Sequence, residues 1–133
     1  LPQYLDKLGI RDRVIVTGFR TDVPRMFAAM DVSVNISNRG EGLTGAMRES
    51  LCMERPVVCT DIGGNRELVR PHETGLLISP NDVTAFVEAT LELLQNPQRA
   101  REMACAGREL VLRDFTEDVR ISRLEQLYYS IAG

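Results

Sequence analysis

The sequence has no tryptophan, a single histidine and only three cysteines among its 133 residues. Cys52, Cys59 and Cys105 have neither metal-ligand spacing nor the spacing of a redox pair. Two of them fall within apolar stretches, where a free thiol behaves as a small hydrophobic side chain. We therefore expect reduced thiols in a cytoplasmic protein, with a metal site only as a remote alternative.

An excess of positive charge and a long hydrophobic run are also missing. The net charge is -3 and the sequence pI is about 5.2, which argues against the basic face that nucleic-acid binding requires. No apolar run approaches the roughly 20 residues of a membrane-spanning helix. With 44% hydrophobic and 26% charged residues, the composition indicates one globular domain over residues 1–133.

Short aliphatic runs alternate with helical patterns. The runs predicted to be strands span residues 14–18, 31–37, 56–60 and 75–79. Helices are predicted after a cap at Asp22, over 44–55 and over 65–70. Nearly continuous apolar strands that alternate with helices indicate a parallel sheet covered on both faces. The expected fold class is therefore α/β, a doubly wound, Rossmann-like parallel sheet.

After Ser79 the pattern predicts helices alone, capped at Asp82, starting again at Pro97 and capped at Thr116. The side chains expected on inward faces of the first and last of these helices are Val83, Phe86, Val87, Thr90, Leu91, Leu94, Ile121, Leu124, Tyr128 and Ile131. Four methionines, Met26, Met30, Met47 and Met53, also fit core positions.

The stretch NRGEGLTGAMRESLCMERPVVCT (38–60) places three glycines, Gly40, Gly42 and Gly45, directly after a predicted strand. Thr44 can cap the helix that follows. Such a loop with free N–H groups at a helix N-terminus suits an anion such as phosphate. The spacing is not that of a P-loop and no lysine follows, and the GxGxxG order alone is weak evidence.

Two glutamates bracket this helix start. Glu49 lies one to two turns into the helix, where its carboxylate can point back and accept the two hydroxyls of a ribose. Glu41 precedes the anion site, where it can bind sugar hydroxyls or stabilise positive charge at an anomeric carbon. Ribose, diphosphate and sugar are the parts of a nucleotide sugar.

The stretch EGLTGAMRESLCM (41–53) resembles the donor motif of the family 4 (group 1) glycosyltransferases, in which two glutamates are separated by seven residues. Three neighbouring blocks resemble that family as well: VIVTGFRTDVPRMFAAMDVSV, PVVCTDIGGNREL and HETGLLISPNDVTAF. The resemblance runs from about Arg13 to Phe115. Four blocks in family order are far more specific than any one motif.

This resemblance implies the GT-B fold, of which the chain would be part of the C-terminal, donor-binding half. It implies transfer of a sugar from a UDP-, GDP- or ADP-sugar with retained anomeric configuration, usually without a metal ion or other cofactor. The site residues it implies are Glu41 as the catalytic residue and Ser37, Gly42, Leu43, Thr44, Glu49, Gly63 and Gly64 as donor-binding residues. Gly63 and Gly64 are equally consistent with a plain turn.

Some positions depart from the family pattern. Ile36 replaces the usual proline, Ser50 replaces the usual alanine, and Arg39 stands where small residues are common. None of these removes an implied contact, but Arg39 would influence the choice of donor or acceptor.

The family's donor domain also begins with two further strands and an Arg and a Lys that neutralise the diphosphate. No such strands precede Val14, and the chain starts at Leu1 rather than Met. We therefore expect a piece of a longer protein, with a sheet incomplete at its N-terminal side. An absent N-terminal domain would bind most of the acceptor. The isolated chain should be inactive, bind donor weakly and tend to self-associate through unpaired sheet edges.

Other readings stay open. The fold could serve a non-catalytic binding or assembly module, or another GT-B enzyme such as a sugar-nucleotide epimerase or a phosphorylase. Glu67 fits a helix cap or an ion pair better than a donor contact, and His72 fits the surface. Glutamates surround the arginines of residues 99–113, which favours a solvated face. Peripheral membrane association of the longer protein is the alternative.

Overall fold

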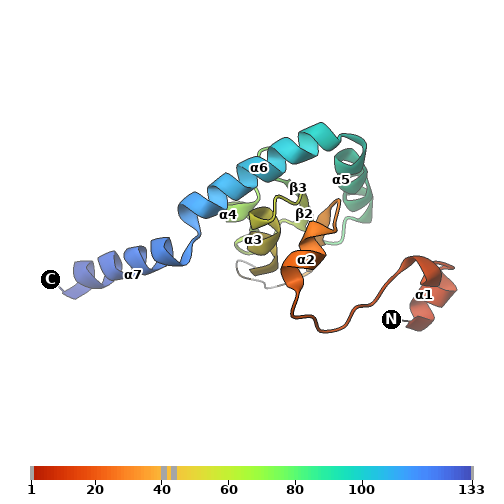
Figure 1. The fold of residues 1–133 in the computed structure, drawn as a ribbon, viewed down its shortest axis with the longest axis horizontal. Coiled ribbons are helices and arrows are strands. Elements are labelled where there is room, and N and C mark those ends of the chain that lie inside the picture. The colour runs from red at the N-terminus through yellow and green to blue at the C-terminus, as the bar shows by residue number, and fades with distance from the viewer. Residues whose placement is uncertain (1, 40–41, 43–44, 133) are drawn as a thin grey trace.

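The computed structural model describes residues 2–39, 42 and 45–132. Its centre is a parallel sheet of three strands in the order β1-β2-β3 (Figure 1). The strands are β1 (Ser33–Asn35), β2 (Val57–Thr60) and β3 (Leu76–Ile78). Ser33 pairs with Val57, and Val58 pairs with Leu76. The predicted parallel α/β fold is confirmed, with strands shorter than the apolar runs that suggested them.

The helices surround and extend this sheet. Their bounds are α1 (Pro2–Lys7), the 3-10 turn η1 (Arg11–Arg13), α2 (Val23–Ala28), α3 (Gly45–Cys52), α4 (Asn65–Leu68), α5 (Val83–Gln95), α6 (Pro97–Asp114) and α7 (Glu117–Ala132). Figure 1 shows α1 set apart from the body on an extended segment, and α7 projecting from the opposite side. No helix within the described residues is both long and apolar enough to cross a membrane.

The central strand, β2, holds the two halves of the core together because all four of its residues are fully buried. Successive side chains of a strand point to opposite faces. Val57 and Cys59 accordingly join one cluster, with Met47 and Leu51 of α3. Val58 joins the other cluster, whose remaining members are Leu76, Ile78, Ala89, Leu93, Ala100 and Met103. Both faces of the sheet are therefore covered.

Helix α6 contributes to both clusters. Ala100 and Met103 belong to the cluster around Val58, and Val111 belongs to the cluster around Val57. Between them, Gly107 faces Leu51 of α3 so closely that a Cβ at Gly107 would lie 2.5 Å from the Leu51 Cδ2 atom. The missing side chain lets the two helices approach each other.

The strand predicted over 14–18 is absent from the structure. These residues form an extended segment without a partner strand in the described chain, and Ile15 and Val16 are 87% and 60% exposed. A strand needs a neighbour for its backbone groups, and an apolar run does not supply one. The prediction was wrong because the pattern reports β-propensity and says nothing of a partner.

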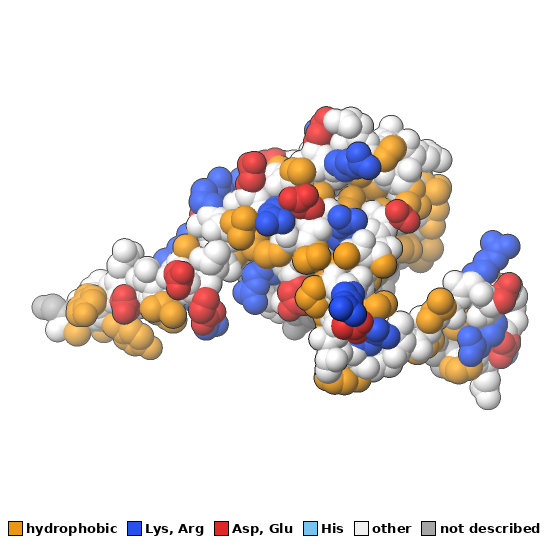
Figure 2. Space-filling model, in the orientation of Figure 1, with side chains coloured by type: hydrophobic (Ala, Val, Ile, Leu, Met, Phe, Trp, Pro, Cys, Tyr) orange, Lys and Arg blue, Asp and Glu red, His pale blue; other side chains and the backbone are white. Residues whose placement is uncertain are grey.

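The predicted inward face is wrong for α7 and only partly right for α5, where Phe86 packs against the core. In α5, Val83, Val87, Leu91 and Leu94 are exposed, Phe86 and Thr90 are half-buried, and Ala89 and Leu93 face the core. The small Ala89 side chain allows close approach to the sheet. In α7, the residues predicted to face inward, Ile121, Leu124, Tyr128 and Ile131, are all exposed, and Figure 2 shows hydrophobic side chains gathered along this helix. α7 leaves the body, so no core lies against it.

The predicted helix caps have mixed outcomes. The Asp82 carboxylate accepts a hydrogen bond from the Ala85 N–H at 2.9 Å, which confirms that cap. Thr116 Oγ1 accepts a longer bond from the Val119 N–H at 3.4 Å. Asp22 does not cap α2 with its side chain; Arg20 binds both carboxylate oxygens instead, which lowers the pKa of Asp22.

The methionine predictions are confirmed only in part. Met47 is buried in the core, as expected. Met26, Met30 and Met53 are half-buried, because α2 and the end of α3 lie at the margin of the body.

Gly75 is a position where the fold demands glycine. A Cβ there would lie 2.9 Å from the Val57 carbonyl oxygen and 2.9 Å from Val69 Cγ1. We expect Gly75→Ala to lower the free energy of unfolding by about 1–3 kcal/mol, because buried backbone and a core side chain must shift. Urea denaturation measures this. Gly42→Ala is the control, since a Cβ there would meet nothing within 4 Å. Equal stability of both variants would contradict the prediction.

Candidate functional site

The carboxyl ends of β1 and β2 lie side by side, because the two strands pair in parallel. Ser37 follows β1, and Thr60 ends β2. Thr60 Oγ1 donates a hydrogen bond to the Ser37 carbonyl oxygen at 2.8 Å and accepts one from the Ser37 N–H at 3.2 Å. Ser37 thus lies at the predicted edge of the sheet, where ligands of doubly wound folds bind.

Gly63 and Gly64 form the turn between β2 and α4. Gly63 has φ of 52°, in the left-handed region that glycine adopts without strain. The Asn65 Nδ2 atom donates to the Thr60 carbonyl oxygen at 2.8 Å, and Arg66 forms an ion pair with Asp61 across the turn. The turn alone accounts for glycine at position 63, and a donor contact there stays a prediction.

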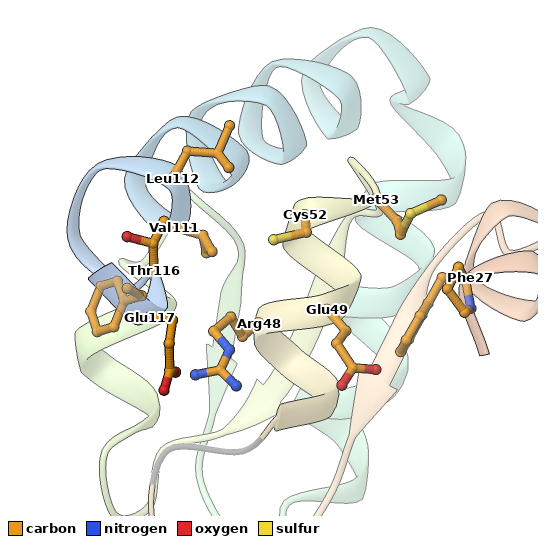
Figure 3. A pocket seen from close by; sticks show the side chains of 11 residues that line it. Phe27, Arg48, Glu49, Cys52, Met53, Val111, Leu112, Thr116 and Glu117 are labelled. Atoms are coloured by element: carbon orange, nitrogen blue, oxygen red, sulfur yellow. The ribbon is translucent and has the colours of Figure 1, made fainter. Parts of the chain in front are cut away.

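Glu49 is exposed on α3, about one helical turn after the helix begins at Gly45. A Cβ at Gly45 would lie 3.8 Å from the Glu49 Oε1 atom, so the carboxylate lies over the first turn of the helix. Figure 3 shows it on the side of α3 that faces Phe27 of α2. The orientation back toward the helix start is the one that the spacing predicted.

A cavity of about 410 Å³ adjoins Glu49 and was not predicted. Its walls come from α2, α3 and the junction of α6 and α7 (Figure 3). Phe27, Cys52, Met53, Val111, Leu112 and Phe115 supply apolar surface, and Arg48, Glu49 and Glu117 supply charged groups. No single segment of the sequence carries a signal for it, because the walls meet only through the packing of α6 on α3.

Of the other residues of the glycine loop before α3, the structure describes Gly42 alone. Gly40, Glu41, Leu43 and Thr44 lie outside the described residues. Gly42 is described and exposed. The catalytic role of Glu41 and the donor-binding roles of this loop therefore stay predictions.

Two buried polar atoms near the site have no hydrogen-bond partner within the part of the chain that is described. They are Ser50 Oγ, on the inner face of α3, and Asn65 Oδ1. Ser50 is the position where the family usually has alanine, and its hydroxyl points into the core. Neither Thr60 nor Asn65 was predicted: strand register brings Thr60 to Ser37, and the turn after β2 brings Asn65 to the Thr60 carbonyl oxygen.

The remaining candidates are a metal site, Glu67, His72 and the cysteines. Across the described ranges no group of three or more His, Cys, Asp and Glu side chains is arranged to hold a metal ion. Glu67 is exposed and lines a second cavity with Arg48 and Arg120, and His72 lies at the surface as predicted. All three cysteines are free thiols.

Comparison with known proteins decides the family. Residues 1–96 match the profile of the family described as glycosyl transferases group 1. The chain belongs to this family. EpsD of Bacillus subtilis (strain 168), a protein named as a glycosyltransferase, is 34% identical to this group 1 chain. The match covers 92% of this chain and 32% of EpsD. A GDP-mannose-dependent phosphatidylinositol monomannoside mannosyltransferase of Mycolicibacterium smegmatis is 32% identical over 96% of the chain and 35% of that protein.

Solved structures agree with the fold. HepE of Anabaena, in complex with UDP, has a TM-score of 0.89 and 25% identity, over 96% of this chain and 35% of HepE. The C-terminal domain of the group 1 protein LpcC from Francisella tularensis has a TM-score of 0.77 at 22% identity, over 86% of this chain and 60% of that domain. The group 1 chain thus has the Rossmann-like fold of these proteins and spans about a third of the length of the curated relatives it matches.

The cysteines should differ sharply in reactivity. Burial, with a smaller effect of the Asp61 charge, raises the pKa of the Cys59 thiol to about 12. Only the thiolate is nucleophilic, and about one Cys59 in ten thousand is ionised at pH 8. Cys105 is exposed. We expect iodoacetamide at pH 8 to alkylate Cys105 and spare Cys59, as followed by mass spectrometry. Urea should make both react, and equal labelling of both in the native protein would contradict the prediction.

Proposed function

We propose that this chain forms part of the donor site of a retaining glycosyltransferase, which transfers a sugar from a nucleotide sugar to an acceptor. The observation that carries the proposal is the place of Glu49. Its carboxylate lies over the first turn of α3, the helix that follows the carboxyl end of β1. A carboxylate so placed can accept hydrogen bonds from both ribose hydroxyls of a nucleotide.

The other roles follow from the family pattern. Glu41 would face the donor sugar and stabilise positive charge at its anomeric carbon. The backbone of Gly42, Leu43 and Thr44 would face the sugar and the diphosphate. Ser37, Gly63 and Gly64 would line the same crevice, and the place of Ser37 beside the end of β2 supports this.

The proposed donor is a UDP-, GDP- or ADP-sugar, used without a metal ion. Support comes from HepE, which was solved with UDP and with UDP-glucose, and from the GDP-mannose dependence in the name of the M. smegmatis relative. A part of the protein outside this chain would bind most of the acceptor. We also propose a cytoplasmic location, where free thiols such as Cys52, Cys59 and Cys105 stay reduced.

Glu49→Ala should weaken nucleotide binding by about a hundredfold or more, because it removes two charge-assisted hydrogen bonds. Saturation-transfer NMR with UDP, GDP and ADP, and with their glucose or mannose conjugates, detects the millimolar affinity expected of this chain. The nucleotide that binds identifies the base.

Glu109→Ala is the matched control, because Glu109 is an exposed glutamate of α6 that lines none of the described cavities near Glu49. It should bind nucleotide like the unaltered chain. If Glu49→Ala also binds like the unaltered chain, Glu49 does not hold the ribose.

The chain alone should release no nucleotide from UDP-glucose, GDP-mannose or ADP-glucose. Helix N–H groups alone compensate a diphosphate poorly, and the family supplies an Arg and a Lys from strands that precede this region. A longer protein with those two strands should bind nucleotide about a thousandfold more tightly, if several charge-assisted bonds are restored. Coupled assays of nucleotide release test turnover. Turnover by the chain alone would contradict the expectation of inactivity, and a longer protein that binds no nucleotide would favour a non-catalytic module.

A further inference from the structure

Thr60 joins the two loops that leave the carboxyl edge of the sheet. Backbone pairing of β1 with β2 ends at Asn35 and Cys59. Beyond that pair, the Thr60 hydroxyl forms the hydrogen bonds between the two segments, one with the N–H and one with the carbonyl oxygen of Ser37. A hydroxyl can donate one hydrogen bond and accept two, so one side chain replaces a rung of the strand ladder.

The backbone of Thr60 is tied to the second loop. Its carbonyl oxygen accepts hydrogen bonds from Asn65 Nδ2 at 2.8 Å and from the Ile62 N–H at 3.0 Å. Asn65 is 1% exposed and begins α4, directly after Gly63 and Gly64. Ser37, which precedes the glycine loop, and Asn65, which follows the Gly63–Gly64 turn, are thus both bonded to the fully buried Thr60.

We propose that Thr60 is a positioning residue of the donor site, whose hydroxyl fixes the direction in which the chain leaves β1 at Ser37. The inference rests on the proposed function. Thr60 itself is fully buried and therefore does not touch the donor. It acts through Ser37, because the direction of the chain at Ser37 determines where the following loop can meet a ligand.

A purely structural role is the competing explanation, and Thr74 offers the comparison that separates the two. Thr74 is also buried, at 1% exposure, and its hydroxyl also makes two backbone bonds. It donates to the Leu68 carbonyl oxygen and accepts from the Arg70 N–H, each at 2.8 Å. Thr74 precedes β3 and so lies at the amino end of the parallel strands, away from the proposed site.

The experiment compares the unaltered chain with Thr60→Val, Thr60→Ser and Thr74→Val. The first readout, without ligand, is hydrogen exchange of the Ser37 amide by ¹⁵N NMR. The second is the Kd for UDP, GDP and ADP in separate titrations, at a temperature where every variant is folded.

We expect Thr60→Val to speed Ser37 exchange by about tenfold or more and to raise the nucleotide Kd by about fivefold or more. Thr60→Ser keeps the hydroxyl, so its Ser37 exchange rate and its nucleotide Kd should both stay within about twofold of those of the unaltered chain. Thr74→Val should lose stability yet keep the Ser37 exchange rate and the Kd. If Thr60→Val does not fold, Thr60→Ala replaces it, because the smaller side chain leaves room for water to bond Ser37.

Two outcomes overturn the inference while the proposed function stands. In one, Thr60→Val loses Ser37 protection but keeps the Kd of the unaltered chain. In the other, Thr60→Val and Thr74→Val weaken nucleotide binding equally, so that general stability explains the effect. If the unaltered chain binds none of the three nucleotides, the donor-site proposal for this chain fails and the inference fails with it.

Discussion

The burial of β2 is the constraint on which the rest of the structure depends. A strand with both faces in apolar surroundings needs a helical layer on each side. Helix α3 covers the face of Val57 and Cys59, and α5 covers the face of Val58. Because β1 and β3 flank this strand in parallel, the loops that follow β1 and β2 leave the sheet at the same edge, and the position of the candidate site follows from that arrangement.

Apolar burial places the strands and helices, but short polar contacts shape the edge itself. Thr60 holds Ser37, and Asn65 holds Thr60. Glu49 is placed differently, by its position one helical turn after Gly45 on α3. The site thus combines a carboxylate whose direction comes from helix geometry with loops whose paths come from side-chain bonds to the backbone.

Local patterns predicted the elements whose partners lie within the chain. The strands around Val58 and Leu76, the cap at Asp82 and the backward direction of Glu49 follow from periodicity and spacing. The strand predicted over 14–18 and the buried face predicted for α7 were both wrong. A sequence pattern shows which residues share a face, but it does not show whether another part of the chain covers that face. Thr60 was beyond prediction since its partner is 23 positions away and only strand register brings the two together.

Helix α6 couples the unfolding of the two faces of the sheet. It is a single helix of 18 residues that packs into the cluster around Val58 at one end and into the cluster around Val57 at the other. Opening of either layer removes part of the packing that holds this helix, and the helix also supports the other layer. The two sides of the sheet should therefore lose their structure together, as one cooperative unit, although each has its own set of apolar contacts.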